Sequence, residues 1–148
     1  MTQTPDFVAI HERFDKRLTP GQRAEIRRAA GPNDPVLVFS TGRLFKNLLG
    51  PWPSSYRVVW FLPIVAHKDS AERIGKQLAD SSISEARMFQ VLRAEPPLDL
   101  QHLRRLCRQA EPTVNWSDFG KTLWWWSEEA KRKIVEDYLW NKKEDGKK

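Results

Sequence analysis

The sequence predicts an all-α protein in which two packed helical sub-bundles form one compact unit. Three observations favour this fold class. Apolar residues recur at intervals of three or four along most of the chain, which is the spacing of a buried helix face. Capping residues and prolines stand where helices should start and stop. No segment alternates convincingly with the period of two that marks a half-buried strand, and 148 residues suit a single domain.

Residues 1–80 are expected to form the N-terminal sub-bundle. The run Thr19-Pro20-Gly21-Gln22 has the pattern of a capping box with proline at the first helical position, so a helix should extend to about Ala30. Other helices are expected before this run and again after Pro35. The polar segment after residue 68 should contain one short amphipathic helix and the hinge to the second sub-bundle.

The most apolar segment, residues 56–68, leaves two interpretations open. It carries apolar side chains on nearly every side, which fits either a buried helix kinked near Pro63 or a buried strand. We favour the helix, because a lone strand would have no neighbour to satisfy its backbone groups.

Residues 81–148 are expected to form the C-terminal sub-bundle, with a lysine-rich tail that should fray. The strongest apolar nucleus should be the stretch 113–140, in which Asn115 and Ser127 are suited to cap two successive helices. The first helix carries large rings on one stripe, and the second carries an apolar band. Because the link between these helices is short, we expect them to pack on each other.

The charge balance favours a polyanionic partner without proving one. Lysine and arginine number 25 against 19 acidic residues, which gives a formal charge of +6 and an isoelectric point near 9.7. The single cysteine, Cys107, excludes an internal disulfide and fits a reducing compartment. The N-terminus lacks a signal-peptide pattern, and the longest apolar stretch, Val58 to Ala66, is too short to span a bilayer. We therefore expect a cytoplasmic protein without membrane contact.

The sequence offers no convergent set of catalytic groups. The acidic pairs near the C-terminus are adjacent in sequence, which on a helix directs the two carboxylates about 100° apart rather than toward one metal ion. The three histidines are scattered, and no Gly-rich phosphate-binding pattern occurs. We therefore expect no enzymatic activity, no metal site and no cofactor.

Arginines gather on two of the expected helices. After Asp99, apolar residues occupy one arc of a helix, while Arg104 and Arg108 lie on the opposite side and Arg105 lies slightly beyond. These three arginines within five residues form the densest basic patch in the sequence. The helix that starts at Pro20 carries three more arginines against a single acid. An ordinary solvated face is the alternative interpretation for both helices.

Several motifs occur in an order that resembles a known family. LTPGQRAEIRRA stands near the start, ISEARMFQVLRAEPPLDLQHLRRLCRQAEPTVNW follows the centre, and a tryptophan helix and VEDYLW come last. This order is similar to that of the CasB small-subunit family of the type I-E CRISPR surveillance complex, Cascade. The resemblance covers nearly the whole chain and is most specific from Ser84 to Leu139.

The resemblance implies two helical sub-bundles without a catalytic site and a role in antiviral defence. It also implies partners, namely other Cascade subunits including the backbone subunits, a second copy of the chain, guide RNA, and the target and non-target DNA strands. In such a role the small subunit braces the guide–target heteroduplex, holds the displaced strand and stabilises the R-loop. Its contacts would be to nucleic-acid backbone, because the guide reads the sequence.

Carried over position by position, the basic surface of the family suggests nucleic-acid contacts at Arg27, Arg28, Arg87, Arg93, Arg104, Arg105 and Arg108. Arg57 and Lys121 are further candidates, the first from a loosely matching segment and the second from its expected exposure on a helix. A competing hypothesis is a sequence-specific DNA-binding regulator, in which the second and third helices form a helix-turn-helix. Against it, the third helix begins with Val36-Leu37-Val38-Phe39, which suits a core better than a reading surface.

Overall fold

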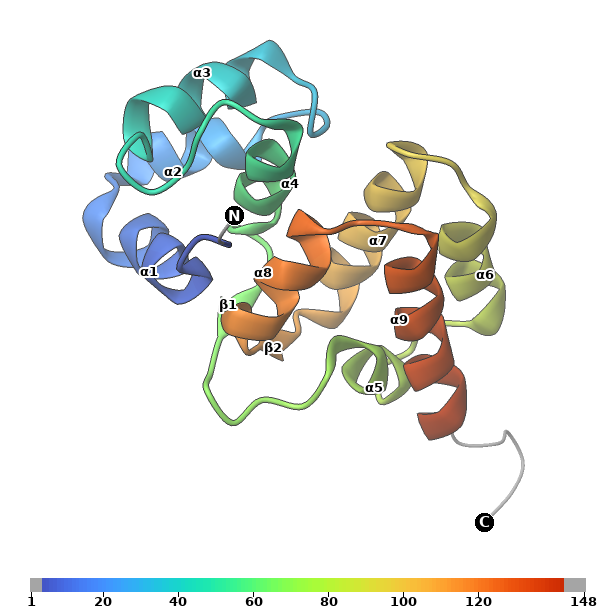
Figure 1. Cartoon of the computed structure of the whole chain (residues 1–148). Coiled ribbons are helices and arrows are strands. Elements are labelled where there is room, and N and C mark those ends of the chain that lie inside the picture. The colour runs from blue at the N-terminus through green and yellow to red at the C-terminus, as the bar shows by residue number, and fades with distance from the viewer. Residues whose placement is uncertain (1–3, 143–148) are drawn as a thin grey trace.

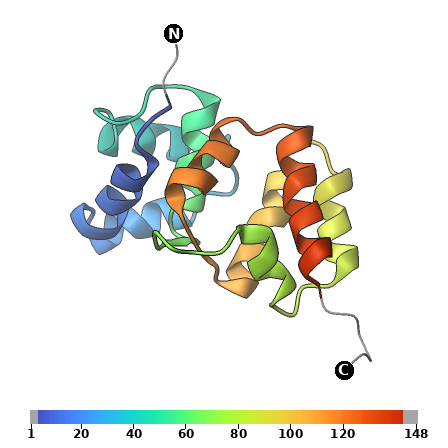
Figure 2. The same cartoon turned by 60° about the horizontal axis from the view of Figure 1, so that its bottom comes forward.

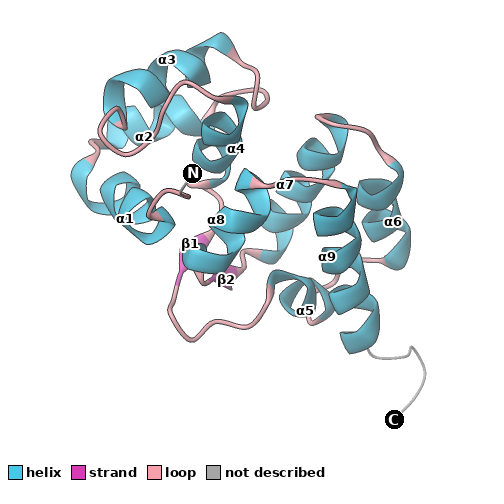
Figure 3. Ribbon diagram, viewed as in Figure 1, coloured by secondary structure: helices cyan, strands magenta, loops and turns pink. Residues whose placement is uncertain are grey.

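The computed structural model describes residues 4–142, and most of its regular structure is helical (Figures 1 and 3), which confirms the predicted fold class. The helices are α1 (Phe7–Glu12), its π-helical continuation η1 (Arg13–Arg17), α2 (Pro20–Arg27), α3 (Pro35–Leu44), α4 (Pro53–Phe61), α5 (Ile74–Ala79), α6 (Glu85–Arg93), α7 (Leu98–Ala110), α8 (Trp116–Trp124) and α9 (Glu128–Asn141). Two short strands, β1 (Ala66–His67) and β2 (Thr113–Val114), pair in parallel. The tail that we expect to fray lies mostly outside the described residues.

The capping residues that the sequence offers do start helices. The Thr19 hydroxyl accepts a hydrogen bond from the Gln22 amide at 3.1 Å, and the Gln22 side chain accepts one from the Thr19 amide at 2.8 Å. The side chains of Ser84, Asn115 and Ser127 accept hydrogen bonds from first-turn amides of α6, α8 and α9. Each bond satisfies an amide that the helix itself leaves unpaired.

The expectation of a kinked helix over residues 56–68 is right for its first part and wrong for its second. α4 ends at Phe61, and Ala66–His67 instead form β1. The unforeseen partner is β2, in which the Val114 carbonyl accepts a hydrogen bond from the Lys68 amide at 2.9 Å. A two-residue strand is too short to show alternation, so its pattern is invisible in the sequence.

The helices form two groups that do not follow the order of the chain. α8 packs on α1 and α4, whereas α9 packs on α5 and α6 (Figures 1 and 2). The expectation that α8 and α9 pack on each other is therefore wrong. The rings of α8 explain the difference, because Phe119 lies 5.3 Å from Trp116 and packs edge-on against Phe61 of α4 at 5.7 Å between centroids. Aromatic rings of this size dominate the packing of a core, so these contacts favour the arrangement of α8 against the N-terminal helices.

The expected division at residue 80 stays a prediction about domains, but the packing of the helices crosses it in both directions. α5 precedes residue 80 and packs on α9, while α8 follows it and packs on α1 and α4. Gly75 permits the first of these contacts, because an added Cβ there would lie 2.5 Å from the Ile134 carbonyl oxygen. Each group thus contains one helix from the other half of the chain.

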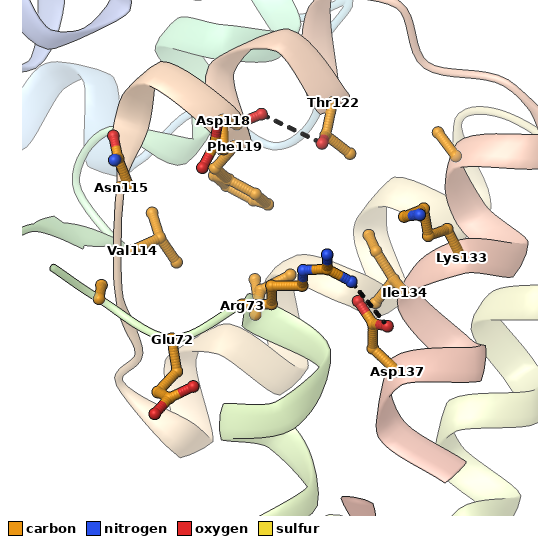
Figure 4. Close-up of a pocket in the computed structure, with 13 residues that line it drawn as sticks. Glu72, Arg73, Val114, Asn115, Asp118, Phe119, Thr122, Lys133, Ile134 and Asp137 are labelled. Carbon is orange, nitrogen blue, oxygen red and sulfur yellow. Dashed lines mark hydrogen bonds and ion pairs between the residues drawn. The ribbon is translucent and has the colours of Figure 1, made fainter. Parts of the chain in front are cut away.

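An open cleft of about 340 Å³ lies between α8 and α9 where we expected a helix–helix contact (Figure 4). Val114, Phe119 and Ile134 contribute apolar surface to it. Arg73, just before α5, reaches across to Asp137 of α9 and forms an ion pair at 3.3 Å. The cleft marks the seam between the two groups of helices.

A buried ion pair ties the start of α9 to the start of α7. Lys131 and Asp99 are both buried, and the Nζ and Oδ2 atoms lie 3.0 Å apart. Lys131 also donates a hydrogen bond to the Ala94 carbonyl at 2.7 Å, and the Trp126 indole donates one to Asp99 at 3.0 Å. Burial disfavours the charged form of Lys131, but hydrogen bonds to Glu128 and Asp99 outweigh it and raise the lysine pKa above its ordinary 10.5. The ammonium group is therefore charged and well partnered inside the fold.

Candidate nucleic-acid interface

The two arginine-bearing helices, α2 and α7, meet at the side chain of Trp60 in α4. The Trp60 indole donates a hydrogen bond to the Ala29 carbonyl, just beyond α2, at 3.0 Å. The Trp60 carbonyl accepts a hydrogen bond from Nε of Arg104 in α7 at 2.9 Å, and the Arg104 guanidinium lies over the indole, 4.6 Å from its centroid. The turn after α2 also approaches α7, since an added Cβ at Gly31 would lie 3.4 Å from the side-chain Nε2 atom of Gln101. Trp60 is thus a shared support for both helices.

Arg104 is buried, which corrects the expectation that it lies on the exposed face of its helix. Only 5% of the residue is exposed. The apolar pattern of α7 correctly places Arg104 opposite the main apolar arc, but Trp60 covers that side of the helix as well. Burial and the nearby positive charges of Arg108 and Arg27 lower the pKa of Arg104 to about 10, so the guanidinium stays charged at neutral pH.

The Arg104 guanidinium has a hydrogen-bond donor that the fold does not satisfy. Its Nη2 atom is buried and has no hydrogen-bond partner within residues 4–142. A buried donor without an acceptor costs about 1–3 kcal/mol, and more when the group is charged. After burial, the like charge of Arg108 lowers the pKa of Arg104 most, and the charge of Arg27 lowers it further, so both arginines contribute positive charge around this guanidinium.

The exposed arginines keep their charge available to a partner. Arg27, Arg28, Arg105 and Arg108 are exposed, as expected from the sequence. In the part of the chain that the structure describes, Arg27, Arg105 and Arg108 form no ion pair and no side-chain hydrogen bond. Arg28 lies near Glu25, but that carboxylate already accepts hydrogen bonds from other side chains. We call Arg27, Arg104 and Arg108 the arginine cluster.

Arg57 and Lys121 lie elsewhere, at α8. Arg57 of α4 is half-buried and donates hydrogen bonds to the carbonyls of Leu123 and Trp124 at 2.7 and 2.8 Å. These bonds satisfy the last carbonyls of α8, which a helix leaves unpaired, so Arg57 serves as a helix cap. Burial lowers the pKa of Arg57. Lys121 is exposed on the same helix, and its contact with nucleic acid stays a prediction.

Arg87 and Arg93 both belong to α6. Arg87 donates a hydrogen bond to the side chain of Gln109 on α7, and Arg93 lies exposed over the Phe89 ring at 5.6 Å from its centroid. These contacts leave donors on both guanidinium groups, and their role in binding stays a prediction. Neither residue is among the charges that act on Arg104.

The support that sequence reasoning missed is Trp60. Within its apolar run it looks like any other core aromatic residue, and no spacing links it to Arg104, which lies far along the chain. The pairing arises only when α4 is placed against both α2 and α7. The sequence therefore identifies the arginine-rich helices but not the tryptophan on which they converge.

The described residues offer few groups for chemistry. Within residues 4–142 no three histidine, cysteine or acidic side chains gather as a possible metal site. The thiol of Cys107 is buried, and burial raises its pKa to about 12, so it is not an activated nucleophile. No helix of that part of the chain has the length and apolarity needed to cross a membrane.

The competing regulator hypothesis gains no support from α3. The exposed side chains of this helix include Phe39, which is 63% exposed, and Val36, which is 47% exposed. Apolar side chains cannot donate hydrogen bonds to base edges, which a reading helix needs. The one basic residue of α3, Arg43, is paired with Glu25 at 3.2 Å.

Comparisons with known proteins relate the chain to a CRISPR system. The model of the family described as CRISPR-associated protein Cse2 matches residues 22–139, a span that includes the whole arginine cluster. The chain is 28% identical over 154 residues to the CRISPR system Cascade subunit CasB of Escherichia coli strain K12, covering 94% of this chain and 96% of that protein. A chain in the crystal structure of E. coli Cascade bound to a PAM-containing double-stranded DNA target is similar in fold, with a TM-score of 0.80 and 27% identity. That match covers 94% of this chain and 97% of the other.

Proposed function

The chain belongs to the family of CRISPR-associated protein Cse2, and from this premise we propose that it is a non-catalytic small subunit of a type I-E Cascade complex in antiviral defence. In this role it contacts nucleic-acid backbone and stabilises the R-loop of guide RNA and target DNA together with the displaced strand. Its partners are the other Cascade subunits, including the backbone subunits, and a second copy of itself. The similarity to a chain of DNA-bound E. coli Cascade supports this assignment.

The observation that carries the proposal is the positive charge without a counter-ion where α2 meets α7. The guanidinium groups of Arg27 and Arg108 act on that of Arg104, and none of the three forms an ion pair within residues 4–142. Like charges held close repel one another, so this arrangement favours a bound polyanion. Guanidinium groups suit phosphate oxygens, and such contacts carry no sequence information.

Modest contacts are enough for this role. R-loop formation exchanges a DNA duplex for an RNA–DNA heteroduplex of similar stability, so a few backbone contacts shift the balance. Each contact to a single strand contributes about −0.7 to the slope of log affinity against log salt. The arginine cluster with its neighbours Arg28 and Arg105 would therefore give a slope of about −3.5 for a single-stranded oligonucleotide.

The test measures R-loop lifetime in a complex reconstituted with the other Cascade subunits, guide RNA and a target duplex. The test variant reverses to glutamate three exposed arginines of α2 and α7, namely Arg27, Arg105 and Arg108. The control variant reverses three exposed basic residues elsewhere, namely Lys46, Lys68 and Arg132. We expect the lifetime to fall roughly tenfold or more in the test variant relative to the control, because three phosphate contacts become repulsions.

Two outcomes would count against the proposal. Equal lifetimes in the test and control variants would remove these arginines from the interface. Failure of the wild-type chain to co-purify with Cascade subunits and guide RNA would reject the subunit role itself.

A further inference from the structure

We propose that Arg27, Arg104 and Arg108 form a socket for a single phosphate group of a nucleic-acid backbone. The socket lies where α2 and α7 meet at Trp60. The source of the phosphate rests on the proposed function. The chemistry, three guanidinium groups around one tetrahedral anion, can be tested separately with inorganic phosphate.

Arg104 forms the fixed wall of the socket. Its Nε atom is held by the Trp60 carbonyl at 2.9 Å, and its guanidinium lies over the indole, so the group has little freedom to turn. It is 5% exposed, and its Nη2 atom lacks an acceptor within residues 4–142. An anion that reaches Nη2 supplies the acceptor that the fold omits.

Arg27 and Arg108 form the mobile walls. Both are exposed, and neither has an ion-pair or hydrogen-bond partner in the described part of the chain, so their long side chains are free to move. The Nη2 atom of Arg104 is covered in the free protein, and binding therefore requires the surrounding side chains to part. A phosphate placed among the three groups turns their mutual repulsion into attraction.

The socket has a consequence that scattered surface charges lack. Arg27 belongs to α2, whereas Arg104 and Arg108 belong to α7, so one phosphate bridges the two groups of helices. A ligand that binds only the folded state stabilises it by mass action. Phosphate should therefore raise the melting temperature beyond the effect of ionic strength alone.

The first experiment compares thermal unfolding of the full chain in sodium phosphate and in sodium chloride at equal ionic strength and pH. We expect phosphate to raise the melting temperature by about 3 °C once its concentration is roughly tenfold above the dissociation constant. Arg27→Gln should abolish this rise, and it should not lower the melting temperature in chloride, because it removes a charge that repels Arg104 and breaks no hydrogen bond or ion pair within residues 4–142. Arg105→Gln, the matched control, removes an equal charge from α7 outside the socket and should retain the rise.

The second experiment measures binding of a 20-nucleotide oligo(dT) strand to Arg27→Gln, Arg108→Gln and the double variant. If both side chains bind one phosphate, each single change weakens binding roughly tenfold and the double change weakens it little further, because the socket is already lost. If the two side chains made independent contacts, the factors by which the two single changes weaken binding would multiply in the double variant. Arg104→Gln is a poorer test, since it also removes the hydrogen bond to Trp60.

The outcomes separate the socket from the proposed function. Equal melting temperatures in phosphate and chloride, or multiplicative losses in the double variant, would overturn the socket while salt-dependent oligonucleotide binding left the proposed function standing. A phosphate-dependent rise without any oligonucleotide binding would overturn the backbone phosphate as ligand and assign the site to free phosphate. Loss of the rise in Arg105→Gln as well would show a diffuse charge effect and reject the socket.

Discussion

Replacing Lys131 by methionine should destabilise the protein more than any exposed substitution. Methionine keeps much of the length and apolar surface of the side chain but removes the ammonium group from its position 3.0 Å from Asp99. The Asp99 carboxylate, buried at the start of α7, would then retain hydrogen bonds only from the Trp126 indole and the Leu100 amide. The Ala94 carbonyl at the end of α6 would lose its donor as well.

The size of the effect follows from the burial of both charges. Removing one partner of a buried ion pair costs about 3–5 kcal/mol, because the remaining charge loses its direct partner. At about 2–4 °C per kcal/mol for a chain of this size, the melting temperature should fall by about 10 °C. Urea unfolding at pH 7, followed by tryptophan fluorescence, measures the free energy, and the seven tryptophans supply the signal.

A second substitution separates lost charge compensation from lost packing. Asp99→Asn in the Lys131→Met background should recover part of the stability, because the amide is neutral and its oxygen can still accept the Trp126 hydrogen bond. A single variant within about 1 kcal/mol of the wild type would refute the reasoning. So would a double variant that is no more stable than the single one.

The pKa of Lys131 adds a pH dependence with a definite sign. Because the folded-state pKa lies above the ordinary 10.5, the contribution of the charged lysine is fully present below pH 10.5. It is lost as the pH rises through the folded-state pKa. The wild type should therefore lose stability above pH 10.5 more steeply than the double variant, which lacks this group.

Three further tests examine local features. Gly75→Ala should destabilise the fold by about 1–3 kcal/mol, because the added Cβ would lie 2.5 Å from the Ile134 carbonyl oxygen. Gly42→Ala in α3 should stabilise the fold by about 0.5–1 kcal/mol, because the added Cβ has nothing within 4 Å. If urea unfolding showed changes of the same sign in the free energy of unfolding, this pair of predictions would be contradicted. The buried Cys107 thiol, with its pKa raised to about 12, should react with a thiol reagent at pH 8 only in urea, and rapid labelling of native protein would disprove its burial. Arg57→Met should cost about 1–3 kcal/mol by leaving the last carbonyls of α8 unpaired. If Arg57 serves only as a helix cap, the salt slope of oligonucleotide binding should stay unchanged, whereas a shallower slope would support the sequence-based prediction that Arg57 contacts nucleic acid.

Local features of the fold could be predicted from the sequence because their causes are local. The capping box at Thr19 and the cap residues Ser84, Asn115 and Ser127 act within one helical turn, so neighbouring letters suffice to place the helix starts. The all-α class follows from the same periodicity. The helix part of residues 56–68 was foreseen, whereas β1 depends on a partner strand far along the chain.

The candidate site divides in the same way. Exposure of Arg27, Arg105 and Arg108 follows from their places on amphipathic helices and could be predicted. Burial of Arg104 could not, because the side of α7 that it occupies is covered by Trp60 from a distant helix. Periodicity tells which residues face away from one apolar arc, but not whether a second element covers the other side.

Because α5 and α8 each pack in the group of helices formed mainly by the other half of the chain, the fold has a consequence for folding during synthesis. When α1 to α4 leave the ribosome, the rings of Phe7 and Phe61 still lack their cover, which arrives only with α8. The apolar surface of the early chain therefore stays exposed to solvent and chaperones until α8, which ends at Trp124, has also left the ribosome. For the same reason, a recombinant that joined the first 80 residues of one relative to the remainder of another would mix partners inside both cores at once.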